Sequence, residues 1–257
     1  MHRRSGWRTA VMRLASGLML LALGQPAPAR SSLAGDRLAD LPLEISAAPS
    51  EQGKLVLFLS GDTGWGGLER SLARRLARAG IGVVGLDARR YFFVKRSPAE
   101  LARDIERILA VYRRRWHAGR IVLAGYSFGA DALPFAWPLL SARTRRETGL
   151  IALVGLLPEA NFRISLLEML DLPAADDTPV APMLLQLPVR RVVCLYGREE
   201  HSACTLPELA GAERIARPGG HDRDGDAGAV AQAILRRLAV SPPARPPPYR
   251  AAENPHG

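Results

Sequence analysis

The stretch RIVLAGYSFGA, residues 120–130, is an apolar run that leads directly into the pentapeptide Gly125-Tyr126-Ser127-Phe128-Gly129. The pattern Gly-x-Ser-x-Gly alone occurs often by chance. It becomes informative here because it directly follows an apolar run that is typical of a buried strand. A sharp turn from a buried strand into a helix strains the backbone of its central residue and requires small neighbours. The stretch therefore predicts such a turn, with Ser127 raised at the end of a strand as a catalytic nucleophile.

Strand and helix patterns alternate on both sides of this turn. Short apolar runs, typical of strands buried on both faces, occupy residues 55–59, 82–86, 121–124, 150–156 and 192–196, with a shorter one near 213–216. Helical patterns cover residues 68–79 and 227–238, and Ser97-Pro98-Ala99-Glu100 begins another helix with a capping serine. This alternation predicts an α/β-hydrolase fold, with a mostly parallel sheet and helices on both faces.

The serine needs a general base, and in this fold the catalytic residues follow the chain order serine, acid, histidine. Three histidines follow Ser127, namely His201, His221 and His256. His256 lies in the C-terminal tail, whereas His221 lies between a predicted strand and the last helix, where this fold carries its histidine. We therefore predict that His221 is the base.

The acid is less closely defined by the sequence. Glu200 follows the strand at 192–196, on a loop from which a carboxylate can accept a hydrogen bond from the histidine. We predict Glu200, with its neighbour Glu199 close behind. Asp171, Asp176 and Asp177 follow the preceding strand and are the alternatives.

Two backbone amides are expected to stabilise the oxyanion of the reaction. One is the N–H of Phe128, directly after the nucleophile. The other belongs to the turn at residues 60–65, where we predict Asp62 or Thr63 as the donor. This glycine-containing turn lacks the lysine and the spacing of a nucleotide-binding loop. The histidines and cysteines also lack the spacing of a metal site, so we expect neither a metal nor another cofactor.

Both ends of the chain lie outside the predicted domain, which spans residues 30–240. Residues 1–29 resemble a signal peptide, with four arginines, a short apolar core and the small residues Ala27-Pro28-Ala29. The apolar core at 14–24 is shorter than the roughly 18–20 residues that span a bilayer, so we expect cleavage rather than a retained inner-membrane anchor. Residues 241–257 are rich in proline and are predicted to be a disordered tail.

The chain has two cysteines, Cys194 and Cys204, and we predict that they form a disulfide. An even pair in an exported chain is a candidate bridge, and such a bridge typically stabilises a protein by about 2–4 kcal/mol. The signal-like N-terminus and the cysteine pair together predict a periplasmic location.

The formal net charge is +10, yet no basic cluster is interleaved with aromatic residues as in proteins that bind single-stranded nucleic acid. We therefore expect no nucleic-acid partner. A basic chain outside the cytoplasm is suited instead to an anionic lipid surface.

Several motifs, taken in chain order, resemble the bacterial VirJ/AcvB virulence-protein family in its short, single-domain form. They are Ser60-Gly61-Asp62-x-Gly64-Trp65, Gly85-x-Asp87-x-x-Arg90-Tyr91-Phe92, Gly125-Tyr126-Ser127-Phe128-Gly129-Ala130-Asp131, Cys194-x-Tyr196-Gly197-x-Glu199-Glu200 with Cys204, and Gly219-Gly220-His221. The chain departs from the family at Thr63, where another glycine is usual, and at His201-Ser202, where relatives often carry further acids.

The resemblance implies a periplasmic hydrolase of aminoacyl-phosphatidylglycerol that removes lysine or alanine from the lipid headgroup. It implies an anionic phospholipid substrate, and it also links the family to type IV secretion proteins. On this interpretation Glu199, Glu200 or Asp131 is suited to hold the cationic amine of the aminoacyl group. The competing hypotheses are a generic esterase and a catalytically idle periplasmic adaptor for secretion.

Overall fold

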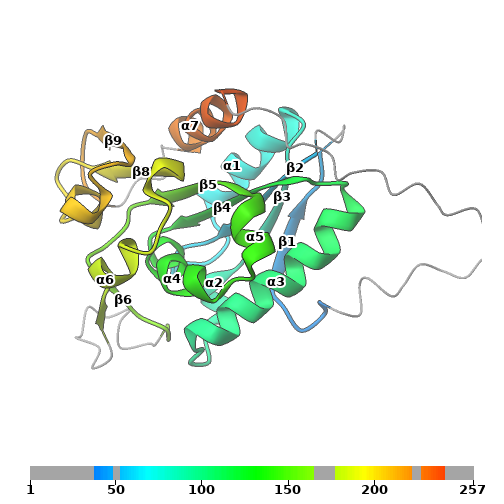
Figure 1. Cartoon of the computed structure of the whole chain (residues 1–257), viewed down its shortest axis with the longest axis horizontal. Helices are drawn as coiled ribbons and strands as arrows, with labels where there is room; N and C mark the ends of the chain where they lie inside the picture. Colours follow the sequence, from blue (N-terminus) through cyan, green and yellow to red (C-terminus); the bar gives the residue numbers. More distant parts are fainter. Residues whose placement is uncertain (1–37, 49–52, 165–176, 222–226, 241–257) are drawn as a thin grey trace, which may run out of the picture. The chain divides into compact units, whose positions relative to one another are not determined.

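A seven-stranded sheet forms the centre of the computed structural model, which describes residues 38–48, 53–164, 177–221 and 227–240. These residues all belong to one compact unit, Leu33–Gly257. In spatial order the strands are β1 (Leu43–Ser46), β3 (Gly82–Leu86), β2 (Lys54–Leu59), β4 (Arg120–Tyr126), β5 (Thr148–Val154), β8 (Val192–Gly197) and β9 (Glu213–Arg217). All neighbouring strands are parallel except β1, which runs antiparallel to β3 at one edge (Figure 1).

The central strands are buried on both faces, which explains their continuous apolar sequences. In β2 every residue from Leu55 to Leu59 is fully buried, and Leu57 pairs with Val84 of β3 and Leu123 of β4. Such a sheet needs a layer of helices on each side. The predicted α/β-hydrolase architecture is thus confirmed.

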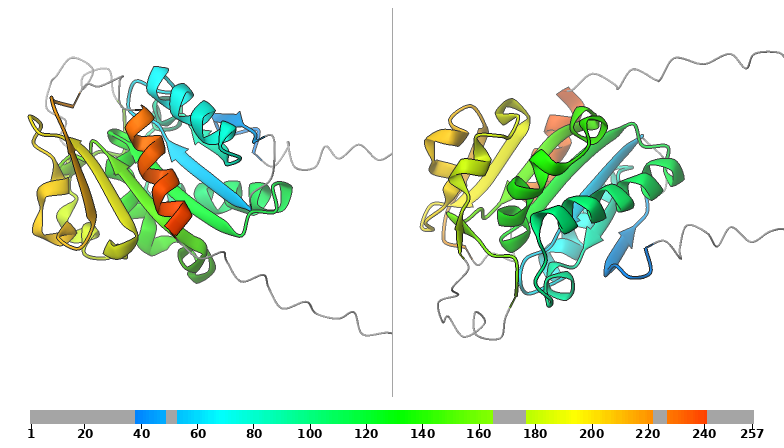
Figure 2. Two further views of the ribbon diagram at one scale, coloured as in Figure 1. Left: turned by 90° about the horizontal axis from the view of Figure 1, so that it is seen from above. Right: turned by 60° about the horizontal axis from the view of Figure 1, so that its bottom comes forward.

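Helices cover both faces of the sheet. Their bounds are α1 (Gly67–Arg78), α2 (Ala88–Tyr91), α3 (Pro98–Arg115), α4 (Phe128–Ala136), α5 (Ala142–Glu147), α6 (Ala181–Leu184) and α7 (Ala227–Val240). The apolar side chains of α1 and α7 share one core cluster with one face of the sheet. Those of α3, α4 and α6 share the cluster on the other face (Figure 2).

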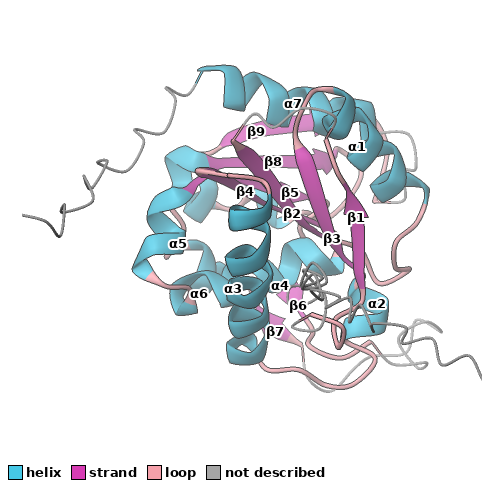
Figure 3. Ribbon diagram, turned by 90° about the vertical axis from the view of Figure 1, so that its right-hand side faces the viewer, coloured by secondary structure: helices cyan, strands magenta, loops and turns pink. Residues whose placement is uncertain are grey.

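The remaining elements are short. A separate two-stranded sheet pairs β6 (Glu159–Ala160) with β7 (Thr178–Pro179), near α4 and α6 (Figure 3). Single 3₁₀ turns lie at Trp137–Leu139, Val189–Arg191, Ala203–Thr205 and Pro207–Leu209.

Most predicted elements are present with small shifts of their ends. The capping residue of α3 is Ser97, whose hydroxyl accepts from the Glu100 amide, and the strand predicted at 150–156 lies at Thr148–Val154. The sequence pattern missed β1, because this four-residue edge strand is only partly buried and has no long apolar run. The predicted signal peptide and tail lie outside the described residues.

The parallel strands all end at the same edge of the sheet, and the loops that follow them meet there. Ser60 follows β2, Asp87 follows β3, Ser127 follows β4, and the loops after β8 and β9 carry Glu200 and His221. Ligand sites of open α/β sheets form at this edge. Among the described residues, no helix is long and apolar enough to cross a membrane.

Candidate active site

Ser127 occupies a strained turn between β4 and α4. Its backbone has φ 49° and ψ −121°, in the region of positive φ that non-glycine residues rarely adopt. A Cβ atom at Gly125 would collide with the carbonyl of Gly129, and one at Gly129 would lie 2.5 Å from the Leu59 carbonyl oxygen. The two glycines of the pentapeptide therefore allow β4, α4 and β2 to approach closely enough for the turn to form.

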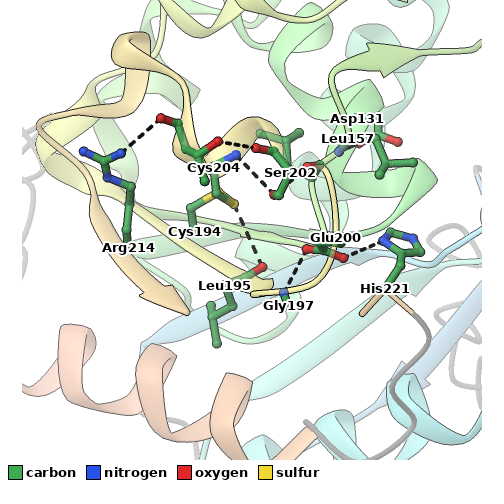
Figure 4. Close-up of a disulfide and its surroundings, with 12 residues drawn as sticks. Asp131, Leu157, Cys194, Leu195, Gly197, Glu200, Ser202, Cys204, Arg214 and His221 are labelled. Carbon is green, nitrogen blue, oxygen red and sulfur yellow. Dashed lines mark hydrogen bonds and ion pairs between the residues drawn. A yellow bond between two sulfur atoms is a disulfide. The ribbon is translucent and has the colours of Figure 1, made fainter. Parts of the chain in front are cut away.

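Three side chains form a continuous chain of hydrogen bonds that begins at this serine. Ser127 Oγ lies 2.7 Å from His221 Nε2, and His221 Nδ1 lies 2.9 Å from Glu200 Oε2. The other carboxylate oxygen of Glu200 accepts a hydrogen bond from the Gly197 amide at 2.9 Å (Figure 4). An ionised Glu200 places the imidazole proton on Nδ1, which leaves the Nε2 lone pair facing the serine hydroxyl.

The imidazole of His221 is positioned by neighbours that the sequence did not indicate. Gly155 has φ 63°, and a Cβ atom there would lie 3.0 Å from His221 Cε1, so the ring occupies the space of a missing side chain. The Tyr126 ring lies nearly parallel to the imidazole, with centroids 6.1 Å apart and an angle of 14°. Gly155 directly follows β5, the strand that pairs with β4. Its position at the end of a predicted buried strand is the signal by which the sequence could have indicated it.

The carboxyl groups considered as alternatives lie elsewhere or are not described. Glu199 is exposed, and its amide donates to the Gly219 carbonyl at 3.1 Å. Asp177 is exposed and lies 3.3 Å from the amide nitrogen of Asn161. Asp171 and Asp176 lie outside the described residues. Among the described carboxylates, the structure thus brings Glu200 to His221.

The two candidate amides of the turn after β2 differ in their hydrogen bonding. The Thr63 N–H donates to the Asp62 carboxylate at 2.9 Å. The backbone amide of Asp62 does not bond to this carboxylate, so Asp62 remains the candidate donor to the oxyanion. The turn lies against the nucleophile, because a Cβ atom at Gly61 would lie 3.6 Å from Ser127 Cβ. Phe128 is the first residue of α4, and the N–H groups of a first helical turn lack intrahelical acceptors.

Glu69 also stabilises the turn after β2, and the sequence pattern did not single out this residue. Its side chain is buried and accepts hydrogen bonds from the Gly66 amide at 2.9 Å and the Gly61 amide at 3.5 Å. Burial raises the pKa of the Glu69 carboxyl, and these backbone donors oppose that rise. The signal in the sequence was the position of Glu69 in the first turn of α1, where acids commonly cap.

A disulfide joins Cys194 in β8 to Cys204, as predicted. Both cysteines are fully buried, and the loop between them carries Glu200 (Figure 4). Ser202 Oγ and the Ala203 amide anchor the same loop by donating to the Leu156 carbonyl at 2.8 and 2.9 Å. The loop that positions the acid is therefore fixed near Cys204, covalently by the disulfide and by hydrogen bonds from the two residues that precede this cysteine.

Asp131 lies one helical turn after the nucleophile and is 5% exposed. Its Oδ1 accepts a hydrogen bond from the Leu157 amide at 2.8 Å, which ties α4 to the loop after β5. Burial raises the pKa of the Asp131 carboxyl well above its ordinary value, and the charges of Asp62 and Glu200 raise it further. The carboxyl groups of Asp62 and Glu200 thus lie close enough to Asp131 to affect its ionisation. In the described ranges no group of three or more acids, histidines or cysteines is placed to hold a metal ion.

The fold and this arrangement define an α/β-hydrolase-fold protein with a serine–histidine–glutamate site. The sequence model of the family described as bacterial virulence protein (VirJ) matches residues 53–241. The chain belongs to this family. A search of curated proteins finds no match.

Several solved structures share the fold of this chain. Est1E from Butyrivibrio proteoclasticus has a TM-score of 0.51 at 13% identity, covering 77% of this chain and 93% of that one. A putative dienelactone hydrolase from Klebsiella pneumoniae has a TM-score of 0.53 at 14% identity, covering 78% and 99%. MenH from S. aureus has a TM-score of 0.55 at 13% identity, covering 77% and 97%. At these identities the likeness concerns the fold alone.

Proposed function

We propose that this protein is a periplasmic serine hydrolase that cleaves the aminoacyl ester of aminoacyl-phosphatidylglycerol. The observation that carries the proposal is the unbroken hydrogen-bond chain from Ser127 through His221 to Glu200, at 2.7 and 2.9 Å. A serine hydroxyl is a weak nucleophile unless a base removes its proton, and this chain supplies a base with its tautomer fixed.

In the first half of the reaction Ser127 Oγ attacks the ester carbonyl carbon while its proton passes to His221 Nε2. Glu200 stabilises the imidazolium that results, and the amides of Phe128 and Asp62 donate to the oxyanion. Collapse of the tetrahedral intermediate breaks the bond to the glycerol oxygen. That oxygen takes the proton from His221 Nε2, and phosphatidylglycerol leaves.

In the second half water attacks the aminoacyl-serine ester. His221 Nε2 takes a proton from the water, a second tetrahedral intermediate forms, and its collapse returns the proton to Ser127 Oγ. The free amino acid leaves, and the resting hydrogen-bond chain is restored.

The charge near the serine supports a cationic acyl group. Both oxygens of Glu200 are engaged by His221 and Gly197, so the acid of the triad does not hold the amine. Asp62 is exposed and lies close enough to Asp131 to interact with it electrostatically, and the negative charge of its carboxylate suits the α-ammonium of a lysyl or alanyl ester. Family membership supports the lipid substrate, and the disulfide supports an oxidising compartment such as the periplasm.

The experiment mixes the purified protein with vesicles that contain lysyl- or alanyl-phosphatidylglycerol and follows the release of free amino acid. Ser127→Ala should lower the rate by about 10³-fold or more, as loss of a serine nucleophile does in other hydrolases. Ser46→Ala is the control. Ser46 lies in the edge strand β1 and pairs with Val83 near the start of β3, whereas the site lies beyond the other end of β3.

The outcomes separate the competing hypotheses. Release by the wild type and by Ser46→Ala, but not by Ser127→Ala, supports the proposal and ranks the two headgroups. Cleavage of soluble esters without release from either lipid leaves the generic esterase. No cleavage of any ester by the folded wild type refutes the enzyme and leaves the secretion adaptor.

A further inference from the structure

Phe93 and Val94 are large apolar side chains that point into solvent. Phe93 is 72% exposed and Val94 is 62% exposed. Ile45, Leu139 and Leu185 are also exposed, but of the described residues only Phe93 and Val94 form an adjacent pair. Single exposed apolar residues are ordinary, whereas an exposed aromatic–aliphatic pair at a loop tip calls for an explanation.

Phe93 and Val94 directly follow a buried aromatic residue that packs beside the candidate active site. Phe92 is fully buried, and its ring lies 4.8 Å from that of Phe128, the residue that follows the nucleophile. At the start of α2 the Ala88 amide donates to Ser60 Oγ at 2.8 Å. On the other side of the pair the Arg96 amide donates to the Phe162 carbonyl at 3.0 Å. The tip is therefore held at both ends, at the edge of the sheet where Ser127 lies.

The exposed charges around this pair are positive. Arg89 and Arg90 lie just before it and Lys95 lies just after it, and all three are exposed. The nearby acids are engaged, since Asp87 accepts from the Arg90 amide at 3.1 Å and Glu100 lies 3.8 Å from Arg96. Exposed apolar side chains flanked by arginine and lysine match the interface of a membrane that carries anionic lipid.

We propose that residues 89–95, the docking tip, attach this protein to an anionic membrane surface. Phe93 and Val94 enter the headgroup–acyl boundary, while Arg89, Arg90 and Lys95 contact lipid phosphates. The contact of Phe92 with Phe128 then holds the nucleophile close to headgroup level. This inference rests on the proposed function for its substrate, but vesicle binding tests it separately.

The test measures co-sedimentation of the full chain with vesicles of phosphatidylcholine mixed with phosphatidylglycerol, and with vesicles of phosphatidylcholine alone. The wild type should bind the mixed vesicles and bind the neutral ones weakly. The double variant Phe93→Ser/Val94→Ser should bind the mixed vesicles at least about tenfold more weakly, because it loses the apolar insertion. Arg89→Gln/Arg90→Gln should lose about fivefold per charge and become less sensitive to salt.

Leu185→Ser is the matched control. Leu185 is 71% exposed, nearly as much as Phe93. The carbonyl of its neighbour Gln186 accepts a hydrogen bond from Trp137 at 3.0 Å. Trp137 follows the C-terminal end of α4, whereas Ser127 precedes the N-terminal end, so Leu185 lies away from the nucleophile. This variant should bind mixed vesicles as the wild type does.

Hydrolysis of a soluble ester distinguishes loss of docking from loss of the site. If the double variant keeps wild-type activity on alanine methyl ester but loses binding and lipid hydrolysis, the proposal stands. If the wild type binds and the double variant does not, while neither cleaves any ester, docking stands and the proposed function fails. Wild-type vesicle binding by the double variant, equal loss in Leu185→Ser, or no binding by the wild type overturns the docking tip.

Discussion

The nucleophile and its histidine–acid partners are held by different kinds of structure. Ser127 follows β4 in the middle of the sheet, and its turn exists because Gly125 and Gly129 let three backbone segments pack together. His221 and Glu200 follow β9 and β8 at the edge of the sheet. There hydrogen bonds and a disulfide fix the loops.

This difference separates two kinds of failure. A change in the central turn disturbs the packing of β2, β4 and α4, so we expect it to lower the stability of the whole domain. A change in the edge loops leaves the core intact but moves the base relative to the nucleophile. We therefore expect changes at the edge to lower the rate of catalysis more than the stability.

The largest effect is expected from Glu200→Gln, which leaves the fold intact but alters the hydrogen bond to His221. A glutamine can still accept from the Gly197 amide, but it no longer fixes the Nδ1 proton with a negative charge. The rate of ester hydrolysis should fall by about 10²–10⁴-fold, as in other triads that lose their carboxylate. Steady-state kinetics on a soluble ester measure the loss.

Glu199→Gln is the control for that experiment, because Glu199 is an exposed neighbour on the same loop. It removes the same charge from the chain and should keep the activity within a factor of a few. A larger loss in Glu199→Gln than in Glu200→Gln would show that the acid is misassigned. Unfolding curves of both variants should match the wild type within about 1 kcal/mol.

Gly125→Ala should lower the stability of the domain, in contrast to Glu200→Gln, which should lower the rate. We expect a loss of about 3 kcal/mol, since the added methyl group collides with backbone that cannot move freely. Urea unfolding of the variant and the wild type gives the difference. Gly67→Ala is the control, because nothing lies within 4 Å of a Cβ atom at the start of α1. Equal stability of Gly125→Ala and Gly67→Ala would refute the packing argument.

The same contrast explains what the sequence could predict. The central turn was identified from residues 120–130 alone, because its strand, glycines and serine are neighbours in the chain. His221 and Glu200 were selected by chain order, and only the fold shows that their side chains meet Ser127. Gly155 and Glu69 were missed because their importance depends on contacts with residues remote in sequence, which no local pattern records.

Removal of the disulfide tests whether the edge loop needs covalent support. Replacing both cysteines by alanine should destabilise the domain by roughly 2–3 kcal/mol, the value for a bridge that closes a short loop. We also expect a modest fall in kcat, because the loop that carries Glu200 becomes less ordered. Thermal unfolding and ester kinetics on the double variant measure both.

The wild type in the presence of a reductant provides the comparison, since it keeps the cysteine side chains but opens the bridge. It should lose stability toward the level of the double variant. An unchanged midpoint of unfolding together with unchanged kcat in the double variant would mean that the hydrogen bonds to the Leu156 carbonyl suffice to hold the loop.

The smallest effect concerns Asp131, whose side chain connects α4 to the loop after β5. Burial raises its folded-state pKa above the ordinary value of 3.8, so the folded protein binds a proton that the unfolded chain has already released. Folding is therefore favoured most at pH values below 3.8, and this contribution declines as the pH rises through the folded-state pKa. Asparagine does not titrate and can still accept from the Leu157 amide.

Asp131→Asn should accordingly gain stability over the wild type as the pH rises from acid to neutral. Urea unfolding at both pH values measures the gain. Asp104→Asn is the control, because this equally buried carboxylate accepts from Tyr91 at 2.7 Å and Arg107 at 2.9 Å, and loss of its charge should destabilise. A gain at Asp131 accompanied by slower release of lysine or alanine would mean that the protein keeps a buried charge there to hold the cationic amine. A constant stability difference at all pH values would mean that Asp131 contributes through its hydrogen bond to Leu157 alone.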